Sequence, residues 1–287
     1  SIATNGKNIA LTFEFLNRLT IEGNSGELPL KGPETGIRLP KRPFFPSVVG
    51  PRSTAFSPDG KFLYMTGYSW QSAHNGTGAG SVMAVLKLNY ESNEPYSVFV
   101  GEKDKSGSGD KHFDSPTSVD TDKNGNVYVS DLYNDRVQIV DTKGNLIKAI
   151  SVKQPTKVCV HQKTGEVFVF SWGVKSHDTK PGKITIFSSL PDVAQKHEDV
   201  YQFMNYSYYT GINTNVVLDS WVDEPTIWVV FRDEGSVKKL QIKNGKWKVV
   251  TDLANYAKKD ILRIRSTVHN IQQLYFNHKN EKLYIGE

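Results

Sequence analysis

This sequence contains a single cysteine, three methionines and no long apolar run among its 287 residues. An internal disulfide needs two cysteines and a multi-cysteine zinc site needs more, so Cys159 excludes both. The longest apolar stretches, such as VMAVLKL at 82–88, are far shorter than the roughly 20 residues that cross a bilayer. The sequence therefore predicts no membrane span, and its cysteine content leaves the compartment open.

Charge of one sign is not concentrated anywhere along the chain. The net charge is +5, yet 35 basic residues stand among 30 acidic ones, and the densest patch is KDKSGSGDK at 103–111. Binding of nucleic acid needs a basic face with exposed aromatic rings nearby, so this distribution makes a nucleic-acid partner unlikely. The opening residues, SIATNGKN, lack the basic start and apolar core of a secretory signal, and we expect that a signal was never present or has been removed.

What the sequence does contain is enough apolar and aromatic material for a large core. Hydrophobic residues make up 38% of the chain and aromatic residues 11%, which is too apolar for a disordered protein. All-β barrels and propellers reach this length as one unit, so we expect residues 1–287 to form a single domain.

Residues 112–150 contain the clearest repeating unit, HFDSPTSVDTDKNGNVYVSDLYNDRVQIVDTKGNLIKAI. It holds four short apolar runs, of which GNVYVSD and RVQIVD alternate between apolar and polar residues, and each run is bounded by a Gly or Asn turn. This pattern predicts a four-stranded antiparallel meander.

Further copies of this unit lie on both sides of it. They begin with STAFSPDGKFLYMTGYS at Ser53, TKVCVHQKTGEVFVFSW at Thr156 and a looser version at Asn215, and a two-strand copy occupies 271–287. A four-stranded unit repeated about every 40 residues predicts an all-β fold, a β-propeller. Five blades are visible, or six if the chain is truncated. We expect residues 8–22 and 272–286 to close the ring as one composite N-/C-terminal blade, and any helix to lie near 190–200 or 252–262.

The segment 112–150 resembles the NHL repeat. The resemblance rests on Pro116 entering the first strand, the VD pair at 119–120, the GNVYVSD strand ending at Asp131, the NDRVQ turn and the closing VDTKG. It is weaker at 51–67 and 155–170 and marginal at 215–252. NHL propellers usually have six blades and include peptide-amidating lyases, RNA-binding and protein-binding modules, and bacterial extracytoplasmic proteins. Membership would therefore imply the fold far better than the function.

Two charged residues of this repeat invite a functional interpretation. Asp131 and Arg136 flank the turn LYND and could be an exposed acid and a guanidinium that binds substrate. We favour the alternative in which Asp131 accepts amide protons in the turn and Arg136 pairs with it.

The loops expected on the channel face of the propeller carry the unusual chemistry. These are the loops that precede a first strand or join the second strand to the third, and they are rich in aromatic rings, His and Arg. Rigid rings supply contact area and Arg supplies forked hydrogen bonds. The predicted ligand-binding residues are Tyr68, Trp70, His74, Trp172, Tyr209, Arg232 and Arg265.

The same loops offer histidines for a metal. NHL lyases of the peptide-amidating type hold a metal near the axis with several His ligands, and His112 and His269 are the best candidates here because they precede first strands. Zinc catalysis would need about three ligands to converge, and no cofactor is indicated by the residues alone. His112 packing beside Phe113 and Pro116 at the blade junction is the competing interpretation.

Two classes of function follow from these patterns. The first is a non-catalytic scaffold that binds a protein, peptide or glycan through the channel-face loops. The alternative is a metal-dependent lyase or hydrolase with a His-lined site at the axis, so enzymatic activity stays undecided. The resemblance to extracytoplasmic propellers favours a periplasmic or secreted location, with the cytoplasm as the alternative.

Overall fold

The computed structural model describes most of the chain between residues 53 and 253 and short strands on either side. The described ranges are 2–4, 8–13, 18–23, 48–49, 53–66, 69–70, 82–89, 96–103, 105–171, 182–201, 216–231, 236–253, 273–277 and 282–286. Within them the fold is all-β, as predicted, and the one helical element is a single 3-10 turn, η1 (Leu132–Asn134). No described helix has the length and apolar character that crossing a membrane requires.

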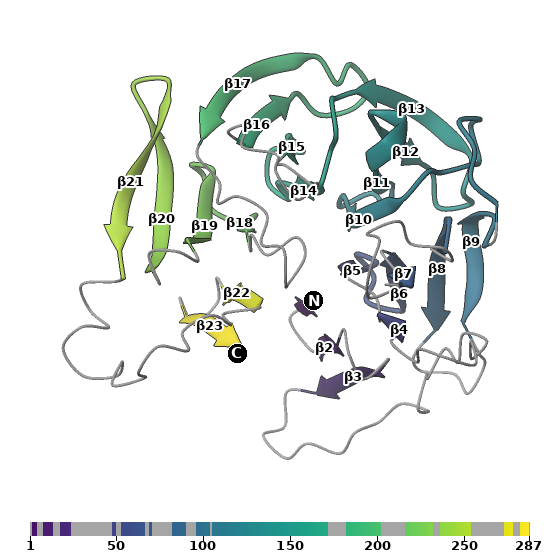
Figure 1. Ribbon diagram of the computed structural model, residues 1–287. Helices are drawn as coiled ribbons and strands as arrows, with labels where there is room; N and C mark the ends of the chain where they lie inside the picture. The colour runs from purple at the N-terminus through teal and green to yellow at the C-terminus, as the bar shows by residue number, and fades with distance from the viewer. Residues whose placement is uncertain are drawn as a thin grey trace. The chain divides into compact units, whose positions relative to one another are not determined.

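Four sheets of four antiparallel strands follow one another along the described chain (Figure 1). We name them the first to the fourth blade. The first blade contains β5 (Ser53–Phe56), β6 (Phe62–Thr66), β8 (Ala84–Asn89) and β9 (Ser97–Gly101), and the second contains β10 (Pro116–Thr121), β11 (Val127–Asp131), β12 (Arg136–Val140) and β13 (Leu146–Ser151). The third contains β14 (Lys157–Val160), β15 (Val167–Ser171), β16 (Gly182–Phe187) and β17 (Gln195–Tyr201), and the fourth contains β18 (Val216–Asp219), β19 (Thr226–Phe231), β20 (Ser236–Lys243) and β21 (Lys246–Asp252). Strand order in each sheet equals chain order, so each blade is the predicted meander.

Shorter sheets flank these blades. One contains β1 (Ile2–Thr4), β2 (Asn8–Phe13) and β3 (Arg18–Gly23), a second pairs β4 (Val48–Val49) with β7 (Ser69–Trp70), and a third pairs β22 (Gln273–Asn277) with β23 (Lys282–Gly286). The strands β2, β3, β22 and β23 coincide with the segments predicted from sequence, whereas β1 and β7 were not predicted. The composite blade of residues 8–22 and 272–286 stays a prediction.

One of the two positions to which any helix was expected to be confined contains a strand instead. Residues 195–201 form β17, the outermost strand of the third blade, where the sequence pattern had suggested a long loop or a helix near 190–200. The strand reads QKHEDVY, and it has no apolar alternation because an outermost strand is only partly covered by its neighbours. The other expected helix position, 252–262, lies almost entirely outside the described residues.

The second strand of each blade lies in the middle of the core. All five residues of β11 are buried, as are the first four of β15. The alternation seen in GNVYVSD therefore does not separate a buried face from an exposed one. Packing on both faces of the sheet explains the burial, because such strands have no solvent face.

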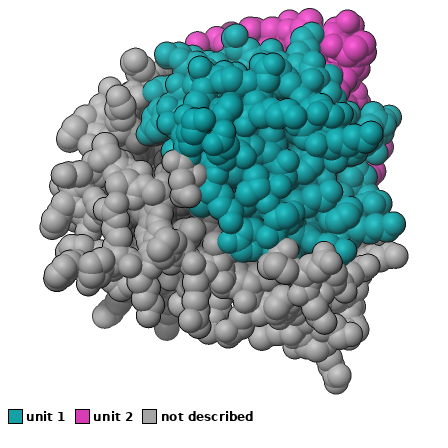
Figure 2. Space-filling model, turned by 90° about the vertical axis from the view of Figure 1, so that its right-hand side faces the viewer, with its two compact units in different colours: residues 1–159 teal, residues 160–287 magenta. Residues whose placement is uncertain are grey.

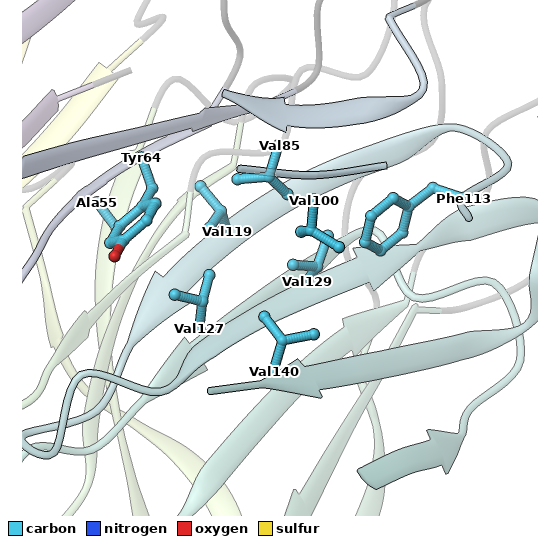
Figure 3. Packing of buried hydrophobic residues seen from close by; sticks show 9 residues of the cluster. All are labelled: Ala55, Tyr64, Val85, Val100, Phe113, Val119, Val127, Val129 and Val140. Atoms are coloured by element: carbon cyan, nitrogen blue, oxygen red, sulfur yellow. The ribbon is translucent and has the colours of Figure 1, made fainter. Parts of the chain in front are cut away.

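The first and second blades pack face to face through one apolar cluster (Figure 3). It joins Ala55, Tyr64, Val85 and Val100 of the first blade to residues that lead into and form the second, among them Phe113, Val119, Val127, Val129 and Val140. Burying a valine fully stabilises the fold by about 1.5–3 kcal/mol, so this cluster is a main source of cohesion between the two blades. Hydroxyl groups add direct bonds, because Thr121 Oγ1 donates to the carbonyl of Phe56 at 2.8 Å.

A β-bulge recurs at the same place in every blade. The register between the third and fourth strands shifts by one residue, which leaves Phe99, Ile147, Lys196 and Val250 as the extra residues of β9, β13, β17 and β21. A bulge twists an edge strand and hinders pairing with another chain. The bulge thus protects the outer edge of each blade from pairing with another chain. Because it recurs at the same place, it also serves as a reference for comparing positions between blades.

The chain divides into two compact units, Ser1–Cys159 and Val160–Glu287 (Figure 2). The boundary falls inside β14, between Cys159 and Val160. The first unit includes the first and second blades, and the second unit includes most of the third and all of the fourth.

Candidate functional site

Most of the predicted site residues fall outside the described part of the chain. Tyr68, His74, Trp172, Tyr209, Arg232, Arg265 and His269 belong to this group, and Trp70 is described only as the last backbone position of β7. His112 is the predicted residue whose side chain the structure places. The candidate site is therefore built around the loop that contains it, residues 102–115, which links β9 to β10.

This loop is folded tightly on itself. The amide of Gly107 donates to the carbonyl of Phe113 at 3.0 Å, and the amide of His112 donates to the carbonyl of Gly109 at 3.1 Å. Ser115 ends the loop with a φ of 65°, a left-handed conformation that is costly for a residue with a side chain. These bonds give residues 107–115 one defined path directly before the first strand of the second blade.

Asp131 holds this loop in place through hydrogen bonds. It is fully buried at the end of β11, its Oδ1 accepts the amide of Asp114 at 2.7 Å, and its Oδ2 accepts Asn134 Nδ2 and Arg136 Nε, both at 2.8 Å. Burial raises the pKa of Asp131, while these hydrogen bonds oppose that shift. The interpretation of Asp131 and Arg136 as a structural pair is confirmed, with the difference that the backbone amide comes from the preceding loop rather than from the LYND turn.

Arg136 and Gln138 extend this support along β12. Arg136 Nη1 donates to the carbonyl of Ser108 at 2.8 Å, and its Nη2 donates to the carbonyls of Gly109 at 2.9 Å and His112 at 3.0 Å. Gln138 Nε2 donates to the same His112 carbonyl at 2.8 Å. Because a guanidinium carries its donors in a rigid fork, one side chain holds three points of the loop at once.

The His112 ring lies within the loop. Its Nε2 is 2.8 Å from Glu102 Oε1, and a Cβ placed on Gly109 would lie only 3.1 Å from its Nδ1. The hydrogen bond to His112 is the main cause that lowers the pKa of Glu102. Glycine at 107 and 109 thus lets the backbone close around the imidazole, because a Cβ at Gly107 would also lie 3.0 Å from the Cβ of His112.

Tyr133 is an exposed aromatic residue beside this loop that the sequence patterns did not single out. Its side chain is 54% exposed in η1, and its amide donates to the carbonyl of Asp114 at 3.1 Å. The available signal was its position in the turn between a second and a third strand, one of the loop classes predicted to lie on the channel face. An exposed ring on a fixed backbone is suited to contact with a partner.

The described residues do not assemble a metal site. No group of three or more His, Cys, Asp or Glu side chains among them could hold a metal ion. His112 and Glu102 form a pair only, and the position of His269 lies outside the described ranges. The metal-ligand assignment of these two histidines stays a prediction.

A second histidine, His161, lies in the turn after β14. It is fully buried, and its Nδ1 lies 3.0 Å from Thr164 Oγ1 and 3.3 Å from the amide of Thr164, which donates to it. Its Nε2 has no hydrogen-bond partner among the described residues. Burial is the main cause that lowers the pKa of His161, against the opposing effects of Glu166, the Val222 backbone and Asp219.

Comparison with known proteins identifies the fold and not a family. No protein-family model matches this sequence, and no curated protein matches it. Among solved structures, the chain is similar to Kuenenia stuttgartiensis hydrazine synthase, with 14% identity, a TM-score of 0.54 and coverage of 86% of this chain and 64% of that one. It is also similar to a streptogramin B lyase, with 11% identity, a TM-score of 0.50 and coverage of 87% and 67%.

These similarities support the β-propeller fold inferred from the repeat, because both proteins are propellers and match over most of this chain. Identities of 14% and 11% carry no information about substrate or partner. The chain spans about two thirds of the length of these structures.

Proposed function

We propose that this chain is a non-catalytic binding scaffold whose channel-face loops recognise a protein, peptide or glycan. The observation that carries the proposal is the anchoring of residues 107–114 by Asp131, Asn134, Arg136 and Gln138. Four side chains of the second blade are used to fix a loop in which Ser108, Asp110 and Lys111 are exposed.

Fixing an exposed loop has a direct effect on binding. A loop that is ordered before binding loses less conformational entropy when a partner arrives, so the same contacts give a higher affinity. Asn134 Nδ2, for example, donates to the carbonyl of Gly107 at 2.8 Å and to Asp131 Oδ2 at 2.8 Å, linking loop and blade through one amide. The second blade thus presents a fixed loop, residues 107–114, with the exposed ring of Tyr133 beside it.

The remaining residues of this surface are proposed from the repeat. Tyr68, Trp70, His74, Trp172, Tyr209, Arg232 and Arg265 are the residues that the sequence predicts for ligand binding. Their rings and guanidinium groups are of the kinds that commonly dominate recognition of a partner.

A peptide-display selection tests this proposal. Peptides selected on the immobilised protein are measured by fluorescence anisotropy against the wild type, Tyr133→Ala and Trp221→Ala. Trp221 is the matched control, because it is 48% exposed but lies in the turn between a first and a second strand, β18 and β19. We expect Tyr133→Ala to lower the affinity about tenfold and Trp221→Ala to leave it unchanged. Equal affinities for all three proteins would contradict the proposal.

The second candidate is a metal-dependent lyase or hydrolase, and one observation favours it. A carboxylate on one imidazole nitrogen, as Glu102 provides for His112, is how metal-binding histidines are commonly oriented. The close approach of Gly109 to the other nitrogen counts against it. Elemental analysis of protein purified without chelator separates the candidates: a stoichiometric transition metal that is lost in a His112→Ala, His269→Ala double variant would replace the scaffold proposal.

We propose further that the repeat is of the NHL type, as the resemblance of 112–150 suggests. In the second blade two turns of the form D-x-x-G-N are built alike: Asp122 accepts the amides of Asn124 and Asn126, and Asp141 accepts those of Lys143 and Asn145. These turns support a common repeat chemistry. A periplasmic or secreted location, suggested by the same resemblance, is also a proposal, and cell fractionation tests it.

A further inference from the structure

The fourth blade carries different side chains from the other blades on one face of its sheet. This is the face opposite to the one that bears Trp247 of β21. In the third strand of each blade, the residue just before the bulge position can be compared directly. It is Val85 in the first blade, Ile139 in the second and Ile186 in the third, all of them buried, and it is the partly exposed Lys239 in the fourth. A position that is aliphatic in three blades is therefore cationic in the fourth.

The register of the β20–β21 hairpin gathers more lysines on the same face. Lys239, Gln241 and Lys243 alternate along β20, and Lys248 lies opposite Gln241 while Lys246 lies opposite Lys243. Directly opposed residues share a face of an antiparallel pair, so all four lysines point to one side. Leu240, Ile242, Trp247 and Val249 point to the other side.

The face that bears Trp247 packs against other residues of the second unit. The ring of Trp247 meets Phe168 of the third blade edge-on, with 6.4 Å between ring centroids, and its amide donates to Asp199 Oδ2 at 3.3 Å. The lysine face is turned away from this contact, and Lys243, Lys246 and Lys248 on it are exposed. In Figure 1 these strands, drawn in light green, form a long hairpin.

The charge on this face is only partly neutralised by the blade itself. Glu224 pairs with Lys243 at 3.2 Å, and Lys239 Nζ lies 5.5 Å from the ring of Trp228. Among the described residues, one carboxylate lies against four lysines, so their contribution to this face is net positive.

We propose that this basic face of β20–β21 is a docking surface for an acidic, extended segment of another protein. Lysines two residues apart along a strand are separated by roughly 6.6 Å, the same spacing as alternate residues of an extended peptide. A segment with acidic residues at alternate positions would thus meet Lys246 and Lys248 in step. Nucleic acid fits less well, because Trp228 is only 8% exposed and offers little ring surface for base stacking.

This surface is separate from the channel-face loops, so its test does not depend on the function proposed above. The probe is a fluorescein-labelled peptide of alternating Glu and Val, with a Gln and Val peptide as the uncharged comparison. Binding is measured by anisotropy to the wild-type chain, to Lys246→Glu, Lys248→Glu and to a control, Lys123→Glu, Lys143→Glu. The control reverses two equally exposed lysines in turns of the second blade.

We expect the acidic peptide to bind the wild type and the control alike and to bind the Lys246→Glu, Lys248→Glu variant about tenfold more weakly, since two attractive charges become repulsive. A milder Lys246→Gln, Lys248→Gln variant should give an intermediate loss, and unchanged melting temperatures would confirm that both variants fold. Binding that survives the charge reversal, or that fails in the wild type, overturns the proposal. So does tighter binding of a single-stranded oligonucleotide or of phosphatidylserine vesicles that is lost in the same variants.

Discussion

The second and third blades place different side chains at the same turn, the one that joins their first two strands. In the second blade Asp122 accepts the amides of Asn124 and Asn126 and the side chains of Asn126 and Tyr128. In the third blade His161 takes this place, because its amide donates to the carbonyl of Glu166 as that of Asp122 donates to the carbonyl of Asn126.

The Asp122 turn and the His161 turn differ in which side-chain atoms have hydrogen-bond partners. Both carboxylate oxygens of Asp122 accept hydrogen bonds, whereas His161 uses Nδ1 for the turn and leaves Nε2 without a partner among the described residues. A carboxylate presents acceptors only, but a neutral imidazole must keep one N–H. The same backbone turn can therefore be made by either residue, and the histidine brings to it a group whose charge ordinarily changes between pH 5 and pH 8.

The largest expected effect comes from the other buried carboxylate of the second blade, Asp131. Replacing Arg136 by Met removes the cation that pairs with Asp131, whose side chain is 0% exposed. Leaving such a charge buried without its partner costs about 3–5 kcal/mol, measured as the free energy of unfolding in urea. The double variant Asp131→Asn, Arg136→Met should be less destabilised than Arg136→Met alone. A loss no larger than that of an ordinary surface substitution would show that the pair is not a structural anchor.

A smaller effect is expected for Asp122→Ala. This change leaves the buried hydroxyl of Tyr128 and the amides of Asn124 and Asn126 without their acceptor, which costs about 1–3 kcal/mol. The matched control is Asp141→Ala, in the turn of the same form between the third and fourth strands, where water can replace the lost acceptor. Chemical denaturation of both variants checks the difference, and equal losses would mean that burial does not set the cost.

The smallest effect concerns pH and His161. Because burial lowers the pKa of His161 in the folded state, the unfolded chain takes up a proton at higher pH than the folded chain does. The stability that depends on neutral His161 is fully present above the unfolded pKa of about 6.5 and is lost as the pH falls toward the folded pKa. Glu166, the Val222 backbone and Asp219 oppose this loss by favouring the protonated form, and Lys163 adds to it.

Replacing His161 by Gln tests this dependence. The free energy of unfolding of the wild type should fall more steeply between about pH 7 and pH 5 than that of the variant, with a difference in slope of at most about 1.4 kcal/mol per pH unit. Taking the difference removes the contributions of the other titrating groups. Parallel curves would indicate that His161 is solvated in the folded protein.

Individual residues show how far the sequence alone predicts this protein. The repeat in 112–150 and its copies at Ser53 and Thr156 predicted the blades, because turns such as D-x-x-G-N are local and their side chains act within a few residues. The strand β17 was missed, because an outermost strand with little apolar contact leaves no periodic signal. Asp131 and Arg136 were interpreted correctly as a pair, but the loop they hold was not foreseen.

The sequence by itself determined the all-β class, the four-stranded unit and its repetition, since these depend on turn residues and short apolar runs that act locally. Only the tertiary structure decided that Arg136 holds the carbonyls of Ser108, Gly109 and His112, residues that lie 24 or more positions away. It also decided which lysines share one face of β20–β21, because that depends on register and on the bulge at Val250. Contacts between distant segments arise from packing, and no local pattern encodes them.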